Sequence, residues 1–172
     1  MRIIKNNLIA LVALLVLVVS ASAAAPGSNQ DEKVRKQLVT LPYYGVFDNL
    51  EYQVTGDTVT LSGQVVNPTT RSDAARRVSK IEGIDHVVNN IEVLPVSQFD
   101  DSVRARTYRA VFRTGGLYRY SMGTNPSIHI VVKNGNVTLE GVVSNRMDSQ
   151  LAYVAANGVP GVFSVTNNLR VE

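Results

Sequence analysis

The chain has 172 residues, of which 45% are hydrophobic and 18% charged, and its formal net charge is +3. This composition is typical of a globular protein and excludes an intrinsically disordered chain. The absence of cysteine excludes disulfides, thiolate metal sites, a catalytic thiol and lipidation on an N-terminal cysteine.

The first residues have the pattern of a secretory signal peptide. Arg2 and Lys5 supply positive charge, an apolar stretch covers residues 8–19, and small residues fill positions 20–25. The apolar stretch has twelve residues, whereas a bilayer-spanning helix needs about 20. We therefore predict a signal peptide, and the alternative is an N-terminal anchor that is not cleaved.

Cleavage is expected after Ala23 or Ala25. The domains are then a signal peptide at 1–25, a first module at 26–95 and a second module at 100–172. Cleaved or kept, the signal places the rest of the chain outside the cytoplasm. We expect a periplasmic protein, free or associated with a membrane.

The first module is predicted to begin with a helix and a β-hairpin. The helix has an apolar stripe that Pro42 ends, formed by Val34, Leu38 and Leu41. Residues 50–54 and 59–65 then alternate between apolar and polar side chains, as half-buried strands do. Gly56-Asp57 between them supplies a tight turn.

A second helix and a third strand complete this module. Asn67-Pro68 is typical of a helix start, and Gly83 is expected to end the helix. The apolar face between them consists of Ala74, Ala75, Val78 and Ile81. Val87 to Leu94 follows as a predicted third strand.

The second module repeats the first at a distance of 78 residues. Residues 57–94 align with 135–172 without a gap, so that Val59 matches Val137 and Gly83 matches Gly161. Asn134-Gly135 favours a type I′ hairpin turn. A helix is again predicted before the hairpin, with an apolar stripe of Val103, Thr107, Ala110, Val111 and Thr114.

Each module therefore has the order αββαβ, and we predict an α+β fold. It consists of two tandem modules, each a three-stranded mixed sheet with two helices on one face. The join at residues 94–99 is short, so the modules should pack against each other rather than hang on a flexible linker.

The repeated residues resemble the BON domain of bacterial envelope proteins. The shared pattern is a turn, V-T-L-x-G-x-V, a helix with a central alanine, a glycine and V-x-N-N-[IL]-x-V, and it occurs twice in register. This resemblance implies a non-catalytic periplasmic protein that associates with phospholipid surfaces, often under osmotic or envelope stress. The second copy departs from the pattern by about nine extra residues within Gly115–Ser127.

Signatures of catalysis are absent from the sequence. It contains no glycine-rich phosphate loop, no G-x-S-x-G and no H-E-x-x-H. His86 and His129 occupy non-equivalent positions in the two copies, and we expect His129 to face solvent from the middle of a strand rather than to bind a metal. We therefore predict a binding protein without catalytic residues, cofactor or metal.

The asparagines that repeat between the copies are interpreted as structural. Asn67 and Asn145 are placed to cap the helices that follow them. The pairs Asn89-Asn90 and Asn167-Asn168 are placed to fix the register of the third strand. Ligand contact is the alternative for both sets.

Charge is distributed unevenly between the two copies. Residues 31–100 carry seven basic and ten acidic residues, a net charge of −3, whereas residues 101–172 carry eight basic and four acidic residues, a net charge of +4. The second copy is therefore the half that an anionic partner would favour.

The basic residues of the second copy concentrate on its first helix and just beyond. Arginine and tyrosine together are typical of a membrane interface, because guanidinium pairs with lipid phosphate and tyrosine lies at headgroup depth. We predict a peripheral site for anionic phospholipid, without nucleic acid as a partner outside the cytoplasm. The proposed lipid-binding residues are Arg106, Arg109, Arg113, Tyr108, Phe112, Tyr118, Arg119 and Tyr120.

Other interpretations of this surface stay open. The arginines also suit a solvated helix face, with Tyr108 and Phe112 packed against the first module, or a surface for other envelope proteins. The alternative function is a soluble stress or chaperone-like adaptor that binds exported proteins through sheet edges or through Tyr43, Tyr44 and Phe47. Self-association of the sheets in a purely structural role is a third option.

Overall fold

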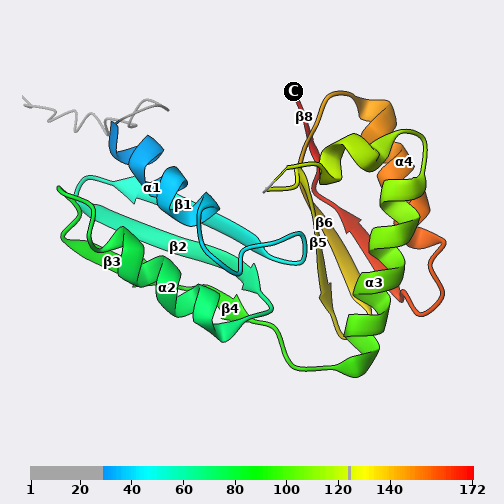
Figure 1. Cartoon of the computed structure of the whole chain (residues 1–172), viewed down its shortest axis with the longest axis horizontal. Helices are drawn as coiled ribbons and strands as arrows, with labels where there is room; N and C mark the ends of the chain where they lie inside the picture. The colour runs from blue at the N-terminus through cyan, green and yellow to red at the C-terminus, as the bar shows by residue number, and fades with distance from the viewer. Residues whose placement is uncertain (1–28, 124) are drawn as a thin grey trace, which may run out of the picture.

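The computed structural model describes residues 29–123 and 125–172, so the predicted signal peptide at 1–25 lies outside the described residues. The first module contains α1 (Asn29–Val39), β1 (Asn49–Thr55), β2 (Thr58–Val65), α2 (Pro68–Val78), β3 (His86–Asn89) and β4 (Glu92–Val93). The second contains α3 (Gln98–Arg113), the 3-10 helix η1 (Leu117–Ser121), β5 (Ile128–Lys133), β6 (Asn136–Val143), α4 (Arg146–Asn157), β7 (Ser164–Asn167) and β8 (Arg170–Val171). Figure 1 shows the two modules side by side.

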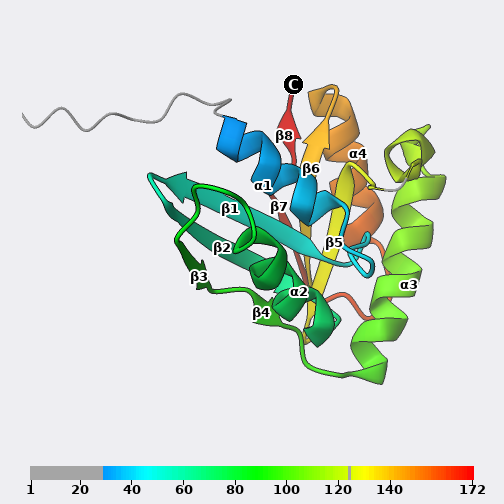
Figure 2. The ribbon, with the colours of Figure 1, turned by 60° about the vertical axis from the view of Figure 1, so that its left-hand side comes forward.

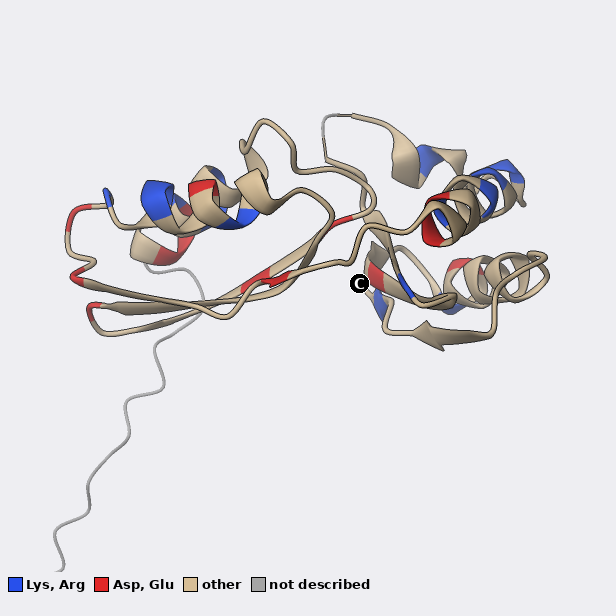
Figure 3. Ribbon diagram, turned by 90° about the horizontal axis from the view of Figure 1, so that it is seen from below, with Lys and Arg blue, Asp and Glu red and all other residues tan. Residues whose placement is uncertain are grey.

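Both modules have the same sheet topology, which confirms the predicted tandem α+β fold. In each, a hairpin of two antiparallel strands, β1–β2 or β5–β6, leads to strands that run parallel to its second strand, β3 and β4 or β7 and β8. The turn at Asn134-Gly135 has φ angles of 51° and 74°, as the predicted type I′ turn requires. The helices cover one face of each sheet and leave the other open, as Figure 3 shows for the first module.

The predicted third strand is interrupted in both copies. In the first, β3 ends at Asn89 and β4 starts at Glu92, because the Asn89 side chain accepts a hydrogen bond from the backbone of Ile91 at 3.2 Å and turns the chain. Its amide also donates to the carbonyl of Arg71 on α2. In the second copy Asn167 likewise accepts from the N–H of Leu169 and donates to the carbonyl of Ser149 on α4. Asn89 and Asn167 therefore have a structural role, because each turns the chain and ties it to a helix.

The helix starts follow the prediction and one helix end does not. Asn67 caps α2 by accepting from the N–H of Thr69, and Asn145 caps α4 by accepting from that of Asp148, both at 2.9 Å. However, α2 ends at Val78, not at Gly83. Gly83 lies in the turn toward β3 with φ +83°, where its carbonyl accepts from Gln30 of α1.

A separate hydrophobic core supports each module. The predicted apolar stripe is buried, with Val34, Leu38 and Leu41 at most 4% exposed, although α1 ends at Val39 and Leu41 lies just beyond it. The stripe packs on β2 and α2 residues of the first core. In the second core the inserted segment contributes Leu117 and Tyr120, while Val46 and Phe47 of the first module pack against it. The modules therefore pack against each other, as the short join predicted.

Candidate functional site

Helix α3 starts at a well-defined cap and buries one face. The Ser97 hydroxyl accepts from the N–H of Asp100 at 3.2 Å, and two aspartates in the first turn suit the helix dipole. Val103, Thr107 and Val111 are fully buried against the sheet. The opposite face carries the exposed Arg109 and Arg113.

The three predicted arginines of α3 fall into two environments. Arg109 and Arg113 are exposed, whereas Arg106 is half-buried in a groove of about 400 Å³ between α3 and α4. Arg109 donates only to the carbonyl of Ala105, one turn earlier, at 3.1 Å. No ion pair involves any of the three arginines within the described part of the chain, so their charge is available to a partner.

An apolar groove of about 470 Å³ lies beside Arg109. It runs between α3 and the α1–β1 connection and is lined by Val46, Phe47, Ala105, Tyr108 and Arg109. The Tyr108 ring lies 6.2 Å from that of Phe47 and 4.8 Å from that of Phe112. Since Tyr108 keeps 36% of its surface exposed, the groove combines apolar surface with a nearby cation.

Two of the predicted lipid-binding residues belong to the core instead. Phe112 and Tyr120 are each only 6% exposed, so neither lies on the surface that was predicted for them. Phe112 turns inward from α3, and Tyr120 is buried because the inserted segment folds back as η1 onto the second module. Tyr118, at 62%, is exposed as predicted, and Met122 beside it is 66% exposed.

Tyr120 and Arg119 both bind the carboxylate of Asp148 on α4. The Tyr120 hydroxyl donates to Oδ2 at 2.5 Å and accepts from the N–H of Ser144 at 2.9 Å, and Arg119 forms an ion pair with the same carboxylate. The hydrogen bond from Tyr120 and the positive charge of Arg119 lower the pKa of Asp148. Arg119 is therefore occupied in fixing η1 to α4.

The predicted solvent-facing position of His129 is wrong. His129 is 8% exposed because the connection between α1 and β1 covers it. Its ring stacks on Tyr44 with centroids 5.3 Å apart, and Nδ1 donates to the carbonyl of Gly45 at 3.2 Å. Burial lowers the pKa of His129, which favours the neutral ring. Alternation along β5 predicted the face of this side chain but not that the other module covers it.

Asp48 fixes the connection that covers His129. Its carboxylate is 4% exposed and accepts from the N–H of Gly45 at 2.9 Å and from that of Val66 at 2.7 Å. Burial raises the pKa of Asp48. The carbonyl of Val46, within the same connection, accepts from the N–H of Ile130 at 2.7 Å. Tyr44 thus belongs to the contact between the modules, whereas Tyr43 is 60% exposed.

The described residues hold neither a cluster of potential metal ligands nor a helix suited to cross a bilayer. Across residues 29–123 and 125–172, no three His, Asp or Glu residues gather so as to hold a metal ion. None of the helices in the same ranges is long and apolar enough to cross a bilayer.

Comparison with known proteins identifies the repeated unit. The family model of the BON domain matches residues 27–95 and 117–172. Two solved structures of CdsD, a structural protein of the type III secretion system of Chlamydia trachomatis, are similar at 10% identity, with TM-scores of 0.34 and 0.30. The matches cover 82% and 85% of this chain and 91% and 98% of those chains. No curated protein matches by sequence. The chain belongs to the BON domain family and carries two copies of that domain.

Proposed function

We propose that this protein is a non-catalytic, exported envelope protein that binds peripherally to anionic phospholipid surfaces and thereby supports envelope integrity or stress tolerance. Membership of the BON family supports an envelope location, and the predicted signal peptide supports export. The net charge of +4 on the second copy supports an anionic partner.

The observation that carries the proposal is the outward surface of α3. Arg109 and Arg113 are exposed and lie one turn apart, and the apolar groove of Phe47 and Tyr108 runs beside Arg109. Guanidinium groups pair with lipid phosphates, while aromatic rings insert at headgroup depth. The structure thus changes the proposed set, because Phe47 of the first copy joins it and the buried Phe112 and Tyr120 leave it.

Binding through this surface would be weak and reversible. A basic residue near an anionic membrane contributes about 1 kcal/mol, so Arg109 and Arg113 together strengthen binding by roughly thirtyfold. The attraction weakens with ionic strength, because exposed charges are screened over about 10 Å at 0.1 M salt. Insertion of Phe47 and Tyr108 supplies the part that salt does not remove.

The test is co-sedimentation of residues 26–172 with vesicles. Anionic and neutral vesicles are compared at low and moderate salt, using the native sequence and an Arg109→Glu/Arg113→Glu variant. The matched control is Lys33→Glu/Lys36→Glu, which makes the same change of charge on exposed positions of α1.

We expect the native chain and the α1 control to bind anionic vesicles at low salt and the α3 variant to lose that binding. Equal loss in both variants would show that only net charge matters and would contradict a site on α3. No binding of the native chain to either vesicle would reject the lipid proposal and direct attention to protein partners.

A further inference from the structure

In each sheet the first strand of the hairpin forms an edge, and these two equivalent edges differ in what covers them. β1 and β5 are the edge strands, and each is joined to its neighbour by a two-residue turn, with Thr55 opposite Thr58 and Lys133 opposite Asn136. In such a hairpin the residues beside the turn bond to the partner strand, and every second residue from there directs its N–H and C=O outward. The outward residues are therefore Leu50, Tyr52 and Val54 in β1, and Ile128, Ile130 and Val132 in β5.

The edge of the second sheet is covered by another segment of the chain. The outward N–H of Ile130 donates to the carbonyl of Val46 at 2.7 Å. Figure 2 shows the connection between α1 and β1 lying against β5. The second copy thus shows that this edge of the domain accepts a backbone partner.

The equivalent edge of the first sheet is open. The repeat of 78 residues places Tyr52 at the position of Ile130. Within residues 29–123 and 125–172, no hydrogen bond reaches the outward N–H or C=O of Tyr52 or Val54. Unpaired groups along a strand edge form a template for another strand.

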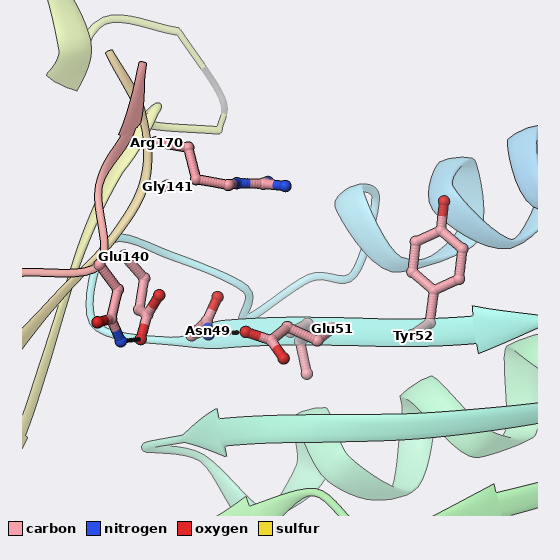
Figure 4. Close-up of a pocket in the computed structure, with 8 residues that line it drawn as sticks. Asn49, Glu51, Tyr52, Glu140, Gly141 and Arg170 are labelled. Carbon is pink, nitrogen blue, oxygen red and sulfur yellow. Dashed lines mark hydrogen bonds between the residues drawn. The ribbon is translucent and has the colours of Figure 1, made fainter. Parts of the chain in front are cut away.

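A cleft of about 540 Å³ runs along the first half of this open edge. Its lining joins Asn49 to Tyr52 of β1 with Glu140, Gly141, Asn168 and Arg170 of the second module. Figure 4 shows Arg170 extending from β8 over the space beside β1, with Glu140 near the start of β1. Asn168 also lines the cleft. The first half of the edge is therefore recessed in a cleft that both modules line.

The chemistry of the cleft favours a particular kind of segment. The half-buried side chains of Leu50, Tyr52 and Val54 share one face of β1, so an added strand places apolar residues beside them. Its other face meets Glu51 and Glu140, which bond to Asn49 and Asn168, and Arg170 is the one cation in the lining. A segment with alternating apolar and basic residues matches both faces.

We propose that the open edge of β1 binds an extended segment of another exported polypeptide, which adds to the first sheet as a strand beside Tyr52 and Val54. The bound backbone pairs with these two residues as Val46 pairs with Ile130. This site is separate from the α3 surface and does not depend on lipid binding.

The test uses residues 26–172 and three nine-residue peptides. Each peptide has valine at alternate positions, with lysine, threonine or glutamate between them. Binding is measured by fluorescence polarisation, and amide hydrogen exchange is followed by NMR with and without peptide. We expect the lysine peptide to bind most tightly and to slow exchange at least tenfold at Tyr52 and Val54, with Glu51 and Gln53 changing little because their N–H groups already bond to β2.

Two controls address the backbone directly. In an extended peptide the N–H groups of the valines point to one edge and those of the lysines to the other. Methylating the backbone nitrogen of every valine, or of every lysine, therefore blocks one edge and leaves the other free. One of these two peptides should bind at least tenfold more weakly than the other. In the protein, Val54→Pro removes an outward N–H and should weaken binding, whereas Gln53→Thr changes an exposed side chain and should not. Thermal unfolding checks that both variants remain folded.

Three results would overturn the proposal. The first is no saturable binding by any of the three peptides at millimolar concentration. The second is binding without protection of Tyr52 and Val54. The third is concentration-dependent dimerisation that protects the same two amides without peptide, which would assign the edge to a second copy of this chain.

Discussion

Asp100 holds Gly135 across the second module. The buried carboxylate at the start of α3 accepts the N–H of Gly135 at 2.8 Å and that of Asn134 at 2.9 Å, and none of its surface is exposed. The turn of the β5–β6 hairpin is thereby fixed to a helix that lies 35 residues earlier in the chain. The position of the edge strand β5 depends on this contact, and so does the hydrogen bond from Ile130 to Val46.

We predict that Asp100→Ala lowers the free energy of unfolding by about 2–4 kcal/mol, because two buried N–H groups lose a charged acceptor. Urea denaturation followed by circular dichroism measures the change. Asp85→Ala, in the turn before β3, is the control, because Asp85 is exposed. A loss below about 1 kcal/mol for Asp100→Ala would contradict the assigned role.

The glycine of V-T-L-x-G-x-V has a steric explanation in both copies. Gly63 and Gly141 have φ angles of 104° and 118°, and a Cβ at either would collide with the backbone carbonyl of Asn49 or Ser127. We expect Gly141→Ala to cost about 3 kcal/mol or more, because strain and overlap act together. Gly45→Ala, where a Cβ meets no atom within 4 Å, should cost less than about 1 kcal/mol. Comparable losses in the two variants would refute the steric account.

His129 makes the stability of the protein depend on pH. Because burial lowers its folded pKa below the ordinary 6.5, the unfolded chain binds the proton more readily. The stabilisation is therefore complete above about pH 7 and falls as the pH drops below about 6.5, by at most about 1.4 kcal/mol per pH unit. Asp48, whose folded pKa is raised from 3.8, acts in the opposite direction at lower pH.

Urea denaturation at pH 7.5 and 5.5 should show a larger loss of stability for the native chain than for His129→Gln, which lacks the titrating group. His86→Gln removes an exposed histidine from β3 and should behave like the native chain. If all three proteins lose the same stability, the protonation of His129 does not cause the pH dependence.

Tyr120 should contribute to stability through its hydroxyl. Tyr120→Phe leaves the ring in the core but deprives Asp148 of a donor and Ser144 of an acceptor. We expect a loss of about 1–3 kcal/mol, measured by thermal or urea unfolding. Tyr118→Phe removes an exposed hydroxyl and should change the stability by less than about 0.5 kcal/mol. The expectation fails if the two variants unfold alike.

The repeat made most of the fold predictable. A shift of 78 residues identified both hairpins, both capped helices and the equivalent third strands before any packing was known. These elements were predictable because each is indicated by a few neighbouring residues: alternating apolar side chains, a helix-capping residue or a turn dipeptide. The position of the break after Asn89 was not predicted, because it depends on the hydrogen bond that the N–H of Ile91 donates to the Asn89 side chain.

The candidate site was predictable only where it depends on one element. The spacing of Arg109 and Arg113 determined their common side of α3. The burial of Phe112 and Tyr120 depends on how the inserted segment folds back, and that of His129 depends on the other module. No local signal in the sequence places Phe47 beside Tyr108 of the other module.

The contact between the modules also determines what the separate halves can show. Cutting the chain near Val96 would remove Val46 from Ile130, uncover the Tyr44 side of His129 and break the ion pair of Lys133 with Glu92. The freed second half would expose a bare strand edge beside an apolar patch, a combination that promotes aggregation. The separate halves of this protein would therefore aggregate through surfaces that the intact chain covers.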